Sequence, residues 1–191
     1  MSVKLDNLIK IIEAMNKKHC YVGIPKKDNK RENPDGSTSP IGNAALAYIH
    51  EHGSMAQHIP ARPFMRPGVR KVKDRITAIM ADGAQVAVER NDPEIIDKML
   101  RKVGTIVAGS MQETINAGIP PPLSPLTVAK RQQRSTGSSY RRLATPEEQQ
   151  QFNARFASGQ ATMAESPTTP LHDTGALIRA INYVVSDEVI K

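Results

Sequence analysis

The sequence predicts a single α+β domain, because long helical segments occupy the middle of the chain and short β-prone segments lie near its two ends. The chain has 191 residues, which is room for one domain, 1–191. Apolar residues recur at intervals of three and four over 67–86 and again over 93–118, a spacing typical of long helices. Strands are expected over 19–24 and 182–189.

The amino-terminal segment, 4–18, is predicted to form a first amphipathic helix. Its expected core face carries Leu5, Leu8, Ile9, Ile12 and Met15. After the first strand, 26–39 contains no apolar residue and has a turn signal at 33–36. These features predict a polar arm that is mobile when the protein is alone.

A second helix is predicted to begin at Ser39-Pro40, which has the form of an N-cap followed by proline, and to end at Gly53. Its expected buried face carries Ile41, Ala44, Ala45, Tyr48 and Ile49. The proline-rich stretch 59–67 predicts extended backbone, after which the first long helix opens at its last proline. A second cap-plus-proline pair, Asp92-Pro93, opens the other long helix.

The chain beyond the second long helix is rich in proline and polar residues. A short helix is expected to start at Ser124-Pro125. The segment 135–168, rich in Ser, Thr, Gly, Gln and Ala, predicts a flexible insertion that holds one capped helix over 145–156. Asp173 is expected to cap the last helix, before the final strand.

Positive charge is concentrated in two segments, 62–75 and 130–142. The chain has 26 Lys and Arg against 19 Asp and Glu, a net charge of +7. No zinc-finger spacing, aromatic stacking set or helix-turn-helix spacing accompanies these clusters, so base-specific recognition is not expected. Contact with phosphate, acidic lipid or an acidic protein face stays open. A non-specific DNA-binding protein that uses both clusters is therefore one hypothesis.

The sequence contains no motif for catalysis or cofactor binding. It lacks the G-x-S-x-G elbow and both phosphate-binding glycine loops, so neither an enzyme nor a cofactor is predicted. The densest group of metal-ligand types is His50, His52 and His58. Histidines two apart on a helix point in nearly opposite directions, which favours a helix end stabilised by the dipole over a metal site. A metal-dependent hydrolase at these three histidines is a further hypothesis.

The cellular setting expected from composition is a reducing one. The single cysteine, Cys20, cannot form an internal disulfide. No apolar run reaches 18 residues, and the first residues lack the apolar region of a signal peptide. We therefore expect no membrane contact and synthesis in the cytoplasm.

Five segments, in order, carry a resemblance to a known family. They are YVGIP (21–25), AYIHEHG (47–53), IPARPFMRP (59–67), PLSPLT (122–127) and TPLHDTGAL (169–177). This ordered set resembles the tailed-bacteriophage virion-morphogenesis proteins of the neck and tail-completion group. The stretch 135–168 between the last two segments is unusually long for that group, and the family pattern assigns no role to His50 and His52.

The resemblance implies a structural virion protein at the head–tail junction, made in the host cytoplasm. Copies would form a six-fold or twelve-fold ring that joins the tail to the DNA-filled head and lets the genome pass. The implied partners are other copies of the chain, the head connector or adaptor, the tail tube or tail terminator, and genome DNA contacted without sequence specificity. The resemblance also implies a small, mostly antiparallel sheet packed on two long helices, with extended polar arms.

Docking residues are expected in the two basic clusters. Proline-fixed backbone loses little freedom on docking, so Phe64 and Met65 are candidate anchors. The alternative is that Phe64 fills the core of the protein itself. The full candidate set is Arg62, Phe64, Met65, Arg66, Arg131, Arg134, Arg141 and Arg142. The polar arms, 26–39 and 135–168, are expected to order on contact with neighbouring subunits.

Overall fold

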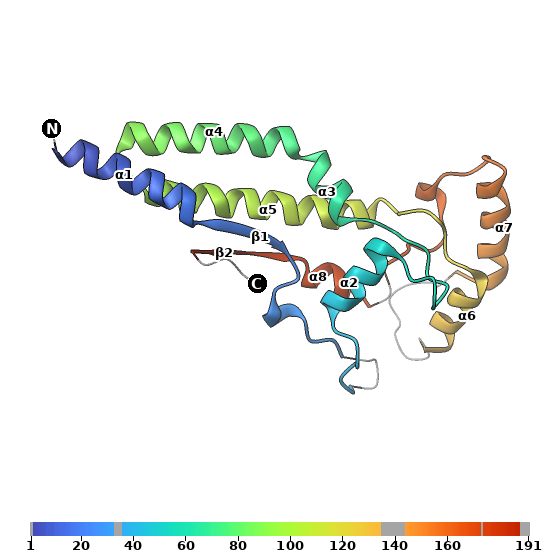
Figure 1. Ribbon diagram of the computed structural model, residues 1–191. Helices are drawn as coiled ribbons and strands as arrows, with labels where there is room; N and C mark the ends of the chain where they lie inside the picture. The colour runs from blue at the N-terminus through green and yellow to red at the C-terminus, as the bar shows by residue number, and fades with distance from the viewer. Residues whose placement is uncertain (1, 33–35, 135–143, 173, 188–191) are drawn as a thin grey trace.

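The computed structural model describes residues 2–32, 36–134, 144–172 and 174–187. These form α-helices and one antiparallel pair of strands, so the α+β class is confirmed in its coarse form. The elements are α1 (Ser2–Lys17), β1 (His19–Gly23), η1 (Lys26–Asp28), α2 (Asn43–His52), α3 (Met65–Lys71), α4 (Lys73–Arg90), α5 (Glu94–Asn116), α6 (Pro125–Arg134), α7 (Pro146–Ala157), η2 (Met163–Glu165), α8 (Ala176–Ala180) and β2 (Asn182–Ser186). The molecule is elongated, with α6 and α7 at the end opposite the amino terminus (Figure 1). Within the described residues, none of these helices has the length and apolar character needed to cross a membrane.

The two predicted strands exist and pair with each other. Their antiparallel register runs from His19 opposite Ser186 to Gly23 opposite Asn182. The pair lies along α5 (Figure 1), where Gly104 leaves room for the ring of Tyr183. Strand pairing therefore places two segments from near opposite ends of the chain against α5, the longest helix.

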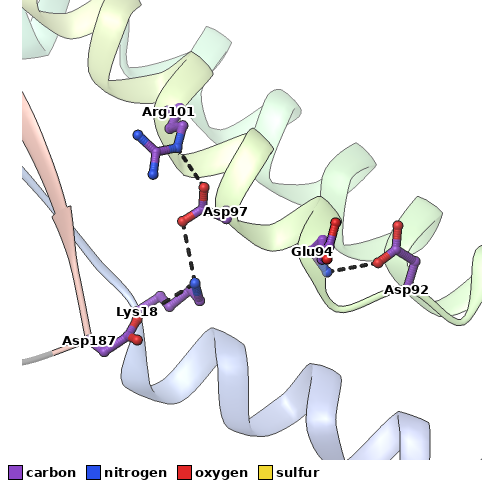
Figure 2. Close-up of polar contacts among 6 residues, drawn as sticks. All are labelled: Lys18, Asp92, Glu94, Asp97, Arg101 and Asp187. Atoms are coloured by element: carbon purple, nitrogen blue, oxygen red, sulfur yellow. Dashed lines mark hydrogen bonds and ion pairs between the residues drawn. The ribbon is translucent and has the colours of Figure 1, made fainter.

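Helix α5 carries most of the core, as its periodicity predicts. Six of the seven residues in the predicted stripe are buried: Ile96, Met99, Val103, Val107, Met111 and Ile115. The helix begins one residue later than predicted, with Pro93 at the N-cap. Asp92 Oδ1 accepts a hydrogen bond of 2.9 Å from the Glu94 backbone N–H in the first turn (Figure 2). A long helix with a continuous apolar stripe needs no distant contact to define which face is buried.

The first long helix differs from the prediction, because it begins at Met65 and is interrupted at Val72. Ser110 Oγ of α5 donates a hydrogen bond of 2.8 Å to the Gly68 carbonyl oxygen, the acceptor that the Val72 N–H would use in a regular helix. The Val72 N–H instead donates to Val69, one residue nearer, at 3.2 Å. The competing hydroxyl thus tightens the turn and divides the predicted helix into α3 and α4.

The face that α1 buries is not the predicted one. Ile11 is buried at 1% exposure, and Ala14 packs beside it on the smaller core cluster. The predicted core face is between 37% and 59% exposed; its members are Leu5, Leu8, Ile9, Ile12 and Met15. Helix α1 therefore presents an apolar stripe to solvent.

Helix α2 also begins and faces differently from the prediction. It starts at Asn43, three residues beyond the predicted proline, and Ala44, Ala45 and Tyr48 of its predicted buried face are exposed. The buried residues are Asn43, Ala47 and Glu51. Buried polar side chains at this helix bind backbone groups of neighbouring segments, which periodicity of apolar residues cannot reveal.

The base of the predicted polar arm, 26–39, is tied to α2. Asn43 Nδ2 donates to the carbonyl oxygens of Asp28 and Lys30 at 3.0 and 3.2 Å. Asn29 Oδ1 accepts from the Ala44 N–H at 2.8 Å, which satisfies a backbone donor in the first turn of α2. A bridge between Glu32 and Thr38 pairs the two sides of the arm. Of the predicted turn at 33–36, residues 33–35 lie outside the described residues.

The helix predicted inside the insertion 135–168 is confirmed as α7. Thr145 and Glu148 form the predicted capping box, with bonds of 3.1 and 2.9 Å. Gln149 donates to Asn153, and Asn153 donates to the carbonyl oxygen of Leu123 just before α6. Residues 135–143 and the predicted cap Asp173 lie outside the described residues, and α8 begins after Gly175, whose φ is 72°.

A polar joint connects α1, α5 and β2 where their ends meet (Figure 2). Lys18 Nζ lies 3.3 Å from Asp97 Oδ1 and 3.6 Å from Asp187 Oδ1. Asp97 also accepts a hydrogen bond from Arg101, one turn along α5. The Arg101 hydrogen bond, with Lys18, holds the pKa of Asp97 below its ordinary value.

Alanine substitutions at the two glycines of α5 test the contact between this helix and the sheet. A Cβ at Gly104 would lie 2.5 Å from the Tyr183 ring, whereas a Cβ at Gly109 would meet nothing within 4 Å. We expect Gly104→Ala to lower the free energy of unfolding by about 1–3 kcal/mol. Gly109→Ala should raise it by about 0.5–1 kcal/mol through helix propensity. Urea denaturation of both variants measures the difference, and equal effects would contradict the packing.

Candidate functional site

The side chain of Glu51 organises the segment between α2 and α3. Its carboxylate oxygens accept backbone hydrogen bonds from Phe64 at 2.8 Å, Met65 at 2.9 Å and Arg66 at 3.1 Å. These N–H groups open α3 and have no partner within the helix. A buried carboxylate is stabilised by such bonds, so Glu51 caps α3 from another helix.

Gly53 lets the chain turn back toward α2 after that helix ends. Its φ of 77° is a left-handed conformation that other residues rarely adopt. A Cβ at this position would also lie 2.8 Å from the Ala61 nitrogen and 2.9 Å from the Ile59 oxygen. The returning chain pairs at Ser54 and Ile59, which accounts for a glycine two residues after Glu51.

Arg62 connects two of the segments that are far apart in sequence. It is buried, and its Nε donates to the Pro121 carbonyl oxygen at 2.8 Å while its Nη2 donates to the Pro122 carbonyl oxygen at 3.2 Å. Its own backbone N–H donates to the His50 carbonyl oxygen at 2.6 Å. Arg62 therefore joins two segments inside the protein, and little of its side chain is exposed to contact a partner.

Phe64 fills the core of the protein itself, which is the alternative to a docking anchor that the sequence left open. The side chain is 0% exposed and packs in the main cluster with Ala47, Val107 and Met111. The bonds from Glu51 hold its backbone and place the ring inward. Of the neighbouring candidates, Met65 is half-buried and Arg66 is exposed.

The second basic cluster is described in part. Arg131 of α6 donates through NH1 to the carbonyl oxygens of His172 at 3.2 Å and Thr169 at 3.5 Å. Arg134 ends α6, and Arg141 and Arg142 lie outside the described residues. The described part of this cluster therefore anchors the segment that precedes α8.

A cavity of about 460 Å³ brings members of the two basic clusters together. Arg62 and Arg131 both line it, as do Arg31 from the polar arm and His50 from α2. The remaining walls come from the end of α2, the segment 57–60, the start of α6 and the segment that leads into α8. Three arginines from separate parts of the chain thus line one partly enclosed space.

The pKa of His50 reflects its position in the wall of this cavity. Burial lowers the pKa of His50 to about 4, and the charges of Arg62, Arg31 and Arg131 act in the same direction. The ring is therefore neutral near pH 7. Its Nδ1 is buried and has no hydrogen-bond partner among the residues that the structure describes.

The three histidines do not converge on one point. His52 points away from His50: it stacks on Tyr48 with a centroid distance of 4.4 Å, and its Nδ1 lies 3.1 Å from the Tyr48 carbonyl oxygen. His58 lines the cavity with His50 and has a φ of 51°. In the described parts of the chain, no group of three or more His, Cys, Asp or Glu side chains is placed to hold a metal ion.

Two residues of this site were not singled out from the sequence. Glu51 lies in a recognised segment, but its role depends on backbone N–H groups thirteen to fifteen residues away. Arg31 belongs to a polar arm in which lysines and arginines carry no distinguishing pattern. Neither position has a local signal that separates it from an ordinary surface charge.

The rest of the first basic cluster forms an exposed surface at α3 and the start of α4. Its members are Arg66, Arg70, Lys71, Lys73 and Arg75. Lys71 Nζ lies 3.3 Å from Glu113 Oε2, and Arg66 lies 3.4 Å from the His52 ring. This exposed basic surface is distinct from the cavity.

Comparison of the chain with protein-family models, with curated proteins and with solved structures finds no match in any of the three.

The buried carboxylate can be tested by removing its charge without changing its shape. We expect Glu51→Gln to lower the free energy of unfolding by about 1–3 kcal/mol, because an amide nitrogen would replace one acceptor oxygen among three backbone donors. Glu113→Gln, which alters an exposed ion pair with Lys71, should cost less than about 1 kcal/mol. Urea titrations of the two variants give the comparison. Similar losses in both would contradict a capping role for Glu51.

Proposed function

We propose that this chain is a structural virion protein that forms a ring at the head–tail junction of a tailed bacteriophage. In this role it is a neck or tail-completion protein that joins the tail to the DNA-filled head and lets the genome pass. The proposal comes from the five sequence segments whose order resembles that of the neck and tail-completion proteins. The observation that carries it is the apolar stripe that α1 leaves exposed.

Helix α1 leaves apolar side chains exposed that a subunit interface would bury. The five members of its stripe are between 37% and 59% exposed in the single chain. Contiguous exposed apolar surface of this kind is typical of sites of protein association, and it supports a protein that completes its burial in an assembly.

The exposed apolar side chains lie at separate places on the molecule. The stripe on α1, defined by Leu5, Leu8, Ile9, Ile12 and Met15, is at one end. Helices α2 and α6 lie away from α1 (Figure 1). They carry Tyr48 and Leu126, which are 65% and 74% exposed. Two unlike surfaces are what a head-to-tail contact requires, and head-to-tail contacts close into rings when the rotation fits.

Glutamine substitutions on the α1 stripe test the ring. We expect Ile9→Gln with Ile12→Gln to convert the wild-type oligomer to monomer, because both side chains are about half exposed in the single chain. The matched control is Lys10→Gln with Glu13→Gln, two exposed positions off the stripe with the same net charge change of zero. Light scattering and native mass spectrometry measure the mass. A wild-type chain that stays monomeric at high concentration and is absent from purified virions would overturn the proposal.

The exposed basic surface at α3 and α4 favours a second candidate, non-specific DNA binding. If that surface contacts duplex phosphates, Arg70→Gln with Lys73→Gln should weaken binding and reduce the slope of log affinity against log salt by about 2. Lys26→Gln with Lys27→Gln removes the same charge from the polar arm and should leave both unchanged. Fluorescence anisotropy at several salt concentrations gives the slopes. Equal slopes for the two variants would count against this candidate.

A further inference from the structure

The cavity between α2, α6 and α8 concentrates positive charge from three separate segments. Arg31, Arg62 and Arg131 line it, and no acidic side chain lines it among the residues that the structure describes. Arg62 is fixed by the carbonyl oxygens of Pro121 and Pro122, and Arg131 by those of Thr169 and His172. The positions of these two charges are therefore set before any ligand arrives, which lowers the entropic cost of binding.

Like charges in a partly enclosed space repel one another, and a bound anion relieves the repulsion. Burial lowers the pKa of His50 most, and the charges of the three arginines lower it further, so all three charges act on the same part of the cavity wall. Charge complementarity thus selects an anion.

Part of the remaining wall is apolar, and this part narrows the kind of anion that fits. Leu46, Ile59, Leu123, Leu171 and Leu177 line the cavity beside the arginines. Inorganic phosphate has no apolar part, so it would leave these side chains facing water. A DNA duplex presents its phosphates on a convex, hydrated surface, which does not fit into a cavity. A carboxylate with an aliphatic group next to it matches both parts of the wall, because arginine binds carboxylates well and leucine surfaces bury alkyl groups.

We propose that this cavity is a binding site for an aliphatic carboxylate, presented by a partner protein segment in which an acidic residue adjoins a leucine-like side chain. The site goes beyond the proposed ring function and does not depend on it, because it is complete within one chain.

The test is an NMR titration of the full chain that follows the His50 imidazole signals. The probes are N-acetyl-leucine, its neutral amide, inorganic phosphate, and the capped peptide Ala-Leu-Glu-Leu-Ala. We expect N-acetyl-leucine and the peptide to shift the His50 signals saturably, and the neutral amide to have no effect. Tighter binding of the peptide than of the free acid assigns the source to a protein segment, whereas the reverse order would overturn that assignment.

Arg31 provides the matched variants, because no hydrogen bond from its side chain supports the fold in the described structure. Arg31→Gln should weaken carboxylate binding at least about tenfold, the effect of losing one close charge pair. Lys30→Gln, an exposed neighbour with the same change in charge, should bind as the wild type does. Circular dichroism checks that both variants fold. Binding of phosphate as tight as that of the carboxylates, equal binding of the neutral amide, an unchanged Arg31→Gln variant, or no shift with any probe would each overturn the site.

Discussion

The bonds from the Glu51 carboxylate to three consecutive backbone N–H groups are the interaction on which the rest of the structure depends. They hold Phe64 at the point where its side chain enters the main core. They also fix the direction in which α3 leaves, and hence where Arg62 meets the carbonyl oxygens of Pro121 and Pro122. One buried carboxylate thus links α2, α3 and the start of α6, because unpaired backbone donors at a helix start need an acceptor.

The arginines of this protein have two physical roles that look alike in sequence. Arg62 and Arg131 are held by backbone carbonyl oxygens and join segments that are far apart in the chain. Arg70 and Arg75 lie on an exposed surface. A guanidinium group has several donors in a fixed plane, so it can bind carbonyl oxygens on one side and still present its charge to a cavity on the other. This dual use explains how a structural network also produces a positively charged cavity.

The distribution of burial is uneven along the molecule. Helix α5 is covered by α3, α4 and both strands and supplies most of the main core. Helix α1 touches the rest of the chain mainly through Ile11 and Ala14, and its apolar stripe faces outward. Because this stripe is not buried in the single chain, it adds no hydrophobic stabilisation there. A protein with this distribution gains stability from association, as the proposed ring requires.

The sequence by itself determined the features that depend on near neighbours in the chain. These include the stripe of α5, the hydrogen bond of Asp92 at its start and the capping box of α7, each set by local spacing or by hydrogen bonds within a few residues. Local composition also predicts the two strands, but their pairing joins segments far apart in the chain. Only the tertiary structure decided which faces α1 and α2 bury, where α3 ends, and which charges meet at the cavity. The physical reason is that each of these results depends on a partner distant in sequence: Ser110 for the break at Val72, and the arm carbonyls for Asn43. Local periodicity records how apolar residues are spaced, but it carries no information about which distant backbone groups need a polar partner.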